Sequence, residues 1–219
     1  MVIDHVNVIW LDRAFFSLLL IGRGAFPLFC YAAAIAILRA DLQNPRRLWE
    51  REKQLFRLLA VAVAAQPFYW YALGEQTANV LFTLALGGIF AKVSLQLKRW
   101  HLYSLYGAGL ASTLAWPLPV DFGMAGVMLP SAIVLALRGE RSVIPFLLLM
   151  IFSMNAAGML TSTDEKVWII LCAFAVAGTL LPLLVLDIAK SLPQQGRLLP
   201  KYALHVFYPA HLALLKVFS

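Results

Sequence analysis

The sequence has few charged residues. Only 13% of its 219 residues are Asp, Glu, Lys or Arg, whereas 62% are hydrophobic, and the mean hydropathy is +0.80. A chain of this composition has too little polar surface to cover a water-soluble globule of this size. The composition therefore excludes an ordinary soluble domain and predicts a protein whose main solvent is lipid.

Cysteine and the common nucleotide motifs are also scarce. Cys30 and Cys172 are the two cysteines, and both lie in apolar runs where a thiol behaves as a small hydrophobic group, so we assign them no chemistry. The chain contains no phosphate-binding loop, no serine-nucleophile elbow and no dinucleotide fingerprint. Because internal repeats and interdomain linkers are missing too, residues 1–219 are expected to form one domain.

Long apolar runs dominate the sequence. Runs of about 18 to 25 residues match the roughly 30 Å hydrocarbon core of a bilayer at 1.5 Å rise per residue. We therefore predict an all-α fold, a polytopic integral membrane helical bundle of about nine spans. The first span is too short to cross and is expected to have a truncated start. The predicted spans are residues 1–10, 14–38, 55–73, 78–97, 102–117, 123–138, 143–160, 167–188 and 202–218.

The basic residues indicate how these spans are oriented. The net charge is +7, and most of the positive charge falls in every second connection between spans. Lys and Arg favour the cytoplasmic side of a membrane, so the basic connections are expected there and no nucleic-acid partner is needed to explain the charge. The basic connections are 39–54, 98–101, 138–141 and 190–201, and the neutral or acidic ones are 74–79, 117–123 and 161–165.

Ionisable residues inside the predicted spans are the candidates for chemistry. Each costs about 2.5 to 3.5 kcal/mol to insert at the centre of a span, so each needs a partner or a role. His5 could take a proton from a hydroxyl or amine nucleophile, or could equally make a structural hydrogen bond. Its neighbour Asp4 points about 100° away on a helix and could pair with Arg23 on the next span.

Arg23 lies between two glycines in the middle of a predicted span. Its guanidinium needs a partner there. That partner is either Asp4 or a backbone carbonyl, or else a phosphate or acyl oxygen that enters from a polar cavity.

The last predicted span holds a second polar group. Tyr208 and His211 are three residues apart on one helical face, with Pro209 between them, and His205 lies nearer the start of the span. These side chains are either satisfied polar contacts or the lining of a cavity. Their spacing does not match a zinc site, so no metal is expected.

Three segments carry a family resemblance. They are Met-Val-Ile-Asp-His-Val-Asn at 1–7, Gly-Arg-Gly-Ala-Phe-Pro-Leu-Phe at 22–29, and Phe-Tyr-Pro-Ala-His-Leu at 207–212. In this order they resemble the TraX family, the membrane acetylases of F-type conjugative pilin, and the first two are similar to the broader membrane acyltransferase superfamily. The resemblance covers essentially the whole chain in its pattern of spans.

The resemblance implies a function and a set of site residues. It implies transfer of acetyl from acetyl-CoA to the N-terminal amine of a pilin subunit held in the bacterial inner membrane. His5 matches the histidine regarded as catalytic in the superfamily, and Asp4 and Arg23 join it in the site. Coenzyme A is expected to be held by Arg23 and, from the basic connection 39–54, by Arg46 and Arg47, whose charge the preference of basic residues for the cytoplasmic side also explains. The residues expected to line the substrate cavity are Tyr208, His211 and His205.

Other functions remain open from the sequence. An O-acyltransferase acting on a cell-envelope sugar would use the same chemistry on another acceptor. A non-catalytic transporter or pilin assembly factor would also place ionisable residues in spans, although the related halves typical of transporters are not found here. Binding of coenzyme A distinguishes the acyltransferases from both non-catalytic proteins.

Overall fold

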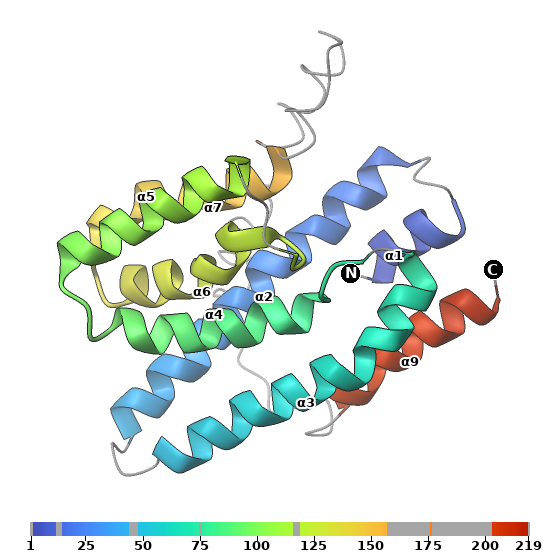
Figure 1. The fold of residues 1–219 in the computed structure, drawn as a ribbon, viewed down its shortest axis with the longest axis horizontal. Coiled ribbons are helices and arrows are strands. Elements are labelled where there is room, and N and C mark those ends of the chain that lie inside the picture. Colours follow the sequence, from blue (N-terminus) through green and yellow to red (C-terminus); the bar gives the residue numbers. More distant parts are fainter. Residues whose placement is uncertain are drawn as a thin grey trace, which may run out of the picture.

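The computed structural model describes residues 2–11, 15–43, 48–74, 76–115, 119–156, 176 and 203–218. Most of these residues are helical and none of them forms a named strand, which confirms the predicted all-α class, and the helices pack lengthwise in a bundle (Figure 1). The helices are α1 (Val2–Ile9), α2 (Phe16–Gln43), α3 (Leu48–Leu73), α4 (Val80–Ser94), α5 (Arg99–Ala115), α6 (Gly123–Leu137), the short 3-10 helix η2 (Arg141–Val143), α7 (Ile144–Ala156) and α9 (Ala203–Val217).

The helices lie close to the predicted spans, with one difference. The connection predicted at 39–54 is mostly helical, because α2 continues to Gln43 and α3 already begins at Leu48. Hydropathy marks where an apolar run ends, whereas Glu, Arg, Lys, Leu and Gln all have good helix propensity and let the backbone continue as a helix. The span predicted at 167–188 lies outside the described residues, apart from Val176.

The surface of the described helices carries many large apolar side chains. Phe56, Val63, Tyr71 and Val206 are each more than 60% exposed. Within the described ranges, no helix is both long enough and apolar enough to cross a membrane.

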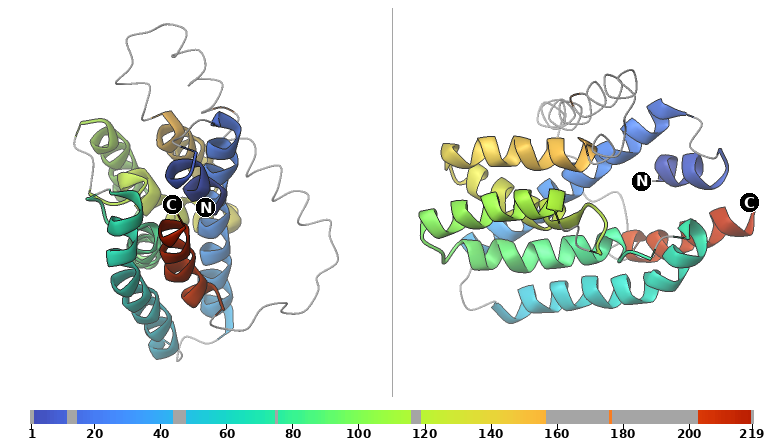
Figure 2. Two further views of the ribbon diagram at one scale, coloured as in Figure 1. Left: turned by 90° about the vertical axis from the view of Figure 1, so that its right-hand side faces the viewer. Right: turned by 45° about the horizontal axis from the view of Figure 1, so that its top comes forward.

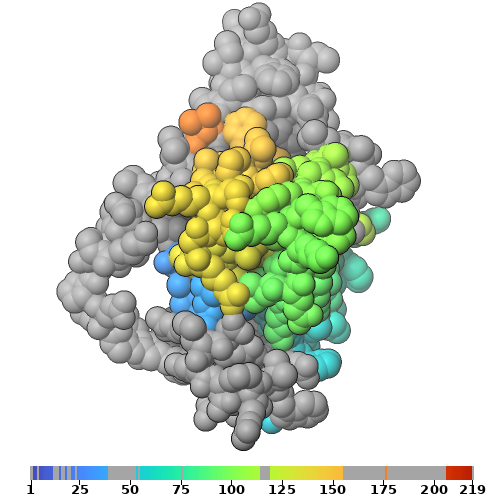
Figure 3. Space-filling view, turned by 90° about the vertical axis from the view of Figure 1, so that its left-hand side faces the viewer, coloured from blue at the N-terminus to red at the C-terminus, as the bar shows by residue number. Residues whose placement is uncertain are grey.

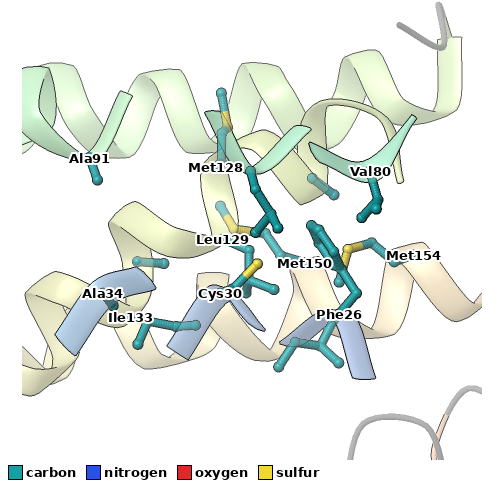
Figure 4. Close-up of a cluster of buried hydrophobic side chains, with 14 of the residues drawn as sticks. Phe26, Cys30, Ala34, Val80, Ala91, Met128, Leu129, Ile133, Met150 and Met154 are labelled. Carbon is teal, nitrogen blue, oxygen red and sulfur yellow. The ribbon is translucent and has the colours of Figure 1, made fainter. Parts of the chain in front are cut away.

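The apolar core lies where α2, α4, α6 and α7 meet. Phe26 and Cys30 from α2 face Met128 and Leu129 from α6, and Met150 from α7 closes the cluster (Figure 4). The flexible side chain of methionine fills irregular gaps between helices of different tilt. On one face of the molecule, α5 and α7 lie side by side over this core (Figure 3).

The connections at the two ends of the bundle are tied together. At one end, the Ala78 N–H donates to the Pro119 carbonyl at 2.8 Å, and the Asp121 N–H donates to the Ala78 carbonyl at 2.9 Å. At the other end, the Arg99 guanidinium lies 2.7 Å from the Glu140 carboxylate. The basic connections near residues 98–101 and 138–141 therefore lie at the same end of the bundle, as their alternation predicted.

The two terminal helices lie beside each other at one side of the bundle, and α9 adds Tyr208 and Leu212 to the core cluster. Helix α9 packs against α3 and α1, while α1 also contacts α2 (Figure 2). The beginning and the end of the described chain therefore meet on one side of the bundle.

Candidate functional site

Helix α1 is held in place by polar contacts at its C-terminal end. The Asn7 side chain donates to the Phe15 carbonyl at 2.9 Å and accepts from the Phe15 N–H at 3.1 Å, which ties α1 to the residue directly before α2. The Trp10 indole N–H donates to the Leu215 carbonyl on α9 at 2.8 Å. These bonds orient the face of α1 that carries His5 toward α9.

His5 and His211 form the centre of the site. Nδ1 of His5 lies 2.9 Å from Nε2 of His211, across 206 residues of sequence. Their ring planes differ by only 6° and their centroids are 5.2 Å apart, about the longest separation that a 2.9 Å contact between ring nitrogens allows. The two imidazoles therefore meet edge to edge in one plane, in a nearly linear hydrogen bond, and do not stack face to face.

Both histidines are buried. His5 is 6% exposed and His211 is 7% exposed. A polar group taken out of water costs free energy unless it finds a hydrogen-bond partner, so the two rings stabilise each other in a largely apolar setting. Within the described part of the chain, no third metal-ligating side chain gathers with this pair.

The surroundings of His211 come from its own helix. Its Nδ1 lies 2.9 Å from the Phe207 carbonyl oxygen, one helical turn earlier. The Phe207 ring lies nearly parallel to the imidazole at 5.1 Å between centroids, and the Tyr208 ring meets it edge-on at 5.5 Å. Spacings of three and four residues place these side chains on one face of α9.

The Tyr208 side chain is buried beside His211. Tyr208 is only 5% exposed, and its hydroxyl has no hydrogen-bond partner among the described residues. Buried hydroxyls in proteins are nearly always paired, which makes this hydroxyl a candidate contact for a further polar group.

The structure brings together some of the predicted site residues. His5, Tyr208 and His211 form one cluster. Asp4 lies on α1, Arg23 on α2 and His205 on α9, but their side chains are outside the described part of the structure. Arg46 and Arg47, predicted to hold coenzyme A, also lie outside the described residues.

Sequence reasoning missed a second buried polar cluster, at the start of α4. The Gln66 amide oxygen accepts from both the backbone N–H and the side chain of Asn79, each at 2.9 Å. Gln66 also donates to the Thr77 carbonyl, Asn79 donates to the Ala62 carbonyl, both at 2.8 Å, and the Asn79 oxygen accepts from Leu81 N–H. An Asn directly before an apolar helix is an N-cap signal that could have revealed part of this cluster.

An apolar groove lies between α3 and α4, toward the basic end of the bundle. Its volume is about 460 Å³. Its lining is apolar except for one lysine and consists of Leu55, Phe56, Leu59, Ile89, Lys92 and Val93.

Fold and site together define a helical-bundle protein with a buried histidine pair contributed by its first and last described helices. The family model for TraX protein matches residues 1–219. The chain therefore belongs to the TraX family.

Two relatives extend over nearly the whole chain. One is Protein TraX of Escherichia coli, 30% identical over 228 residues, which covers 100% of this chain and 82% of the relative. The other is the probable fimbrial assembly protein FimC, serogroup H1, of Dichelobacter nodosus, 28% identical over 242 residues, which covers 98% of this chain and 89% of the relative. No solved structure matches the chain.

Proposed function

We propose that this chain is a multi-pass membrane acetyltransferase that moves the acetyl group of acetyl-CoA to the N-terminal amine of a pilin subunit, with His5 as the general base. The observation that carries the proposal is the buried His5–His211 pair at the contact between α1 and α9. Its other supports are membership of the TraX family and a relative whose name assigns it to fimbrial assembly.

The proposed reaction transfers the acetyl group from sulfur to nitrogen. The amine attacks the thioester carbonyl, a C–N bond forms, the C–S bond breaks, and coenzyme A leaves as a thiolate. His5 takes the proton from the amine and returns it to the thiolate sulfur, so atoms and charges balance. We assign the developing oxyanion to Arg23, with Asp4 as its counter-ion, because a guanidinium fork fits both groups.

The remaining predicted residues contact the substrates in this proposal. Arg46 and Arg47 would bind the phosphates of coenzyme A, and Tyr208, His205 and His211 would line the acceptor cavity. The lipid bilayer of the inner membrane holds the pilin subunit beside them. Large apolar side chains exposed on α3 and α9 support contact with lipid, since water-soluble surfaces rarely gather so many.

The test is the intact mass of pilin from cells that carry or lack this gene. We expect the mass of one acetyl group at the pilin N-terminus only when the gene is present, and its loss in a His5→Gln variant. His101→Gln is the matched control, because His101 is an exposed histidine on α5, away from the pair. Pilin of unchanged mass beside a well-expressed wild-type chain would refute the proposal.

A second candidate is a non-catalytic assembly factor, favoured by the name of the Dichelobacter nodosus relative. It predicts that the number of pili falls when the gene is deleted and is fully restored by His5→Gln, with no change in pilin mass at any stage. Counting pili in the same strains separates the two functions.

A further inference from the structure

The hydrogen bonds of the histidine pair fix where its protons lie. A carbonyl oxygen can only accept a hydrogen bond, so the 2.9 Å contact between His211 Nδ1 and the Phe207 carbonyl requires a proton on Nδ1. A neutral imidazole carries one proton, and Nε2 of a neutral His211 is therefore left as an acceptor.

The assignment passes from His211 to His5. Because Nε2 of His211 accepts, the hydrogen bond at 2.9 Å must be donated by Nδ1 of His5. A neutral His5 then has its lone pair on Nε2, the nitrogen that faces away from His211. The nearly coplanar rings point the N–H of His5 straight at its acceptor, which is the geometry of a strong and directional bond.

Neutrality of both rings follows from their burial. A positive charge on either imidazole would have to be taken out of water into a site that is less than a tenth exposed, which is costly without a paired anion. The neutral pair needs no anion, because each N–H already has an acceptor: His211 Nε2 for His5 and the Phe207 carbonyl for His211.

From these bonds we propose that His211 is a positioning residue, which holds His5 in the Nδ1–H form so that Nε2 is the base for acyl transfer. The catalytic consequence rests on the proposed function, whereas the proton assignment does not. In the reaction, Nε2 of His5 takes the proton from the attacking amine. The resulting imidazolium still donates through Nδ1 to neutral His211. The proton that Nε2 took from the amine then goes to the thiolate of coenzyme A.

The position of His211 is itself fixed by two contacts on α9. The Phe207 carbonyl holds its Nδ1, and the nearly parallel Phe207 ring restricts rotation of the imidazole. A carbonyl has two lone pairs, so this bond to the side chain does not require the helix to lose one of its own. The backbone of α9 therefore orients His211, and His211 in turn orients His5.

The first test measures the protons directly. The full chain, labelled with 15N at histidine and purified in detergent, contains only four histidines, so each ring can be assigned with single variants. The 15N shifts should show His5 and His211 both as Nδ1–H forms at neutral pH. A His5 ring protonated at Nε2 and bare at Nδ1 would overturn the assignment, whether or not the protein acetylates pilin.

The second test separates positioning from packing. In His211→Gln the side-chain amide oxygen can still accept from Nδ1 of His5, whereas in His211→Leu nothing of similar size can. We expect acetylation by His211→Gln to stay within about 10-fold of wild type and that by His211→Leu to fall about 100-fold in kcat, with KM little changed, because the wrong tautomer withholds the base.

Spectra of the two variants complete the experiment. His5 should keep the Nδ1–H form in His211→Gln and lose it in His211→Leu. Equal activity and equal His5 spectra in the two variants would contradict the proposal, even if both proteins fold normally. If the predicted spectra appear in a chain that transfers no acetyl group, the proton assignment holds and the proposed function fails.

Discussion

The two buried polar pairs of this molecule differ in how completely they are satisfied. Gln66 and Asn79 use their amide oxygens and nitrogens on each other, on the carbonyls of Ala62 and Thr77, and on the first turn of α4. His5 and His211 form a single bond between them, beside a Tyr208 hydroxyl without a partner in the described structure. Saturation is what structural polar clusters need, and unused capacity is what a site for another molecule needs.

The largest expected effect is the loss of acetylation rate in a variant of the histidine pair. In His5→Gln the acetylation rate should fall roughly 100- to 10,000-fold, the usual contribution of a general base, because an amide cannot take a proton at neutral pH. The unfolding free energy in detergent should change by less than about 1 kcal/mol, since Gln can still donate to His211. Rates from pilin mass and unfolding curves of the same preparation test both halves. A large loss of stability would place the pair among structural clusters.

The opposite result is expected for the saturated pair. Asn79→Ala removes the cap of α4, one of the two donors to the Gln66 oxygen, and the side-chain donor to the Ala62 carbonyl, which should cost about 2 kcal/mol of unfolding free energy. The acetylation rate per folded molecule should stay near that of wild type. Asn79→Asp, which keeps the capping oxygen and loses the donor, is the matched control and should fall between the two. An Asn79→Ala protein as stable as wild type would show that the Gln66–Asn79 pair is no more structural than the histidine pair.

A smaller effect tests the unused hydroxyl. Tyr208→Phe removes a group that has no partner in the described structure, so the stability should be unchanged or slightly higher. Tyr106→Phe breaks a 2.6 Å bond to Ser131 in the same kind of buried setting and should cost about 1 kcal/mol. Thermal unfolding of the two variants side by side is the measurement. Equal losses in both would show that Tyr208 has a structural partner.

The smallest effect is expected at the surface. Arg99→Met breaks the ion pair with Glu140, but the Arg99 side chain is 75% exposed and solvent screens its charge. The loss should stay below about 0.5 kcal/mol and vanish in high salt. Unfolding curves at low and high ionic strength check it. A loss of unfolding free energy that persists in high salt would show that the contact between the two basic connections stabilises the bundle more than an exposed ion pair should.

Much of the fold could be predicted from the sequence. The apolar runs located each helix of the described part, because burial of helices on several sides requires such runs. The extension of α2 to Gln43 and the early start of α3 at Leu48 were missed, since a hydropathy pattern follows the solvent and not the backbone. Interfacial residues with good helix propensity continue a helix beyond its apolar part.

The candidate site was predictable only as a set of residues. The cost of burying an ionisable group pointed to His5 and His211, and the three-residue spacing placed Tyr208 beside His211. The meeting of His5 with these two depends on how α9 packs against α1, and no local pattern spans 206 residues. The proton assignment is further still from sequence, because it depends on which atom of His211 faces the Phe207 carbonyl. The Gln66–Asn79 cluster was missed because the search for site residues selected ionisable side chains, and amides carry no charge.

The meeting of the first and last described helices has a consequence for biosynthesis. Translation proceeds at about 5 to 20 residues per second, so His5 emerges from the ribosome roughly 10 to 40 seconds before His211, which follows it by 206 residues. Until then α1 lacks the acceptor for its imidazole and the carbonyl for Trp10. The growing chain therefore holds an incomplete pair throughout most of its synthesis, and the acyl transfer that we propose requires that α9 has docked beside α1.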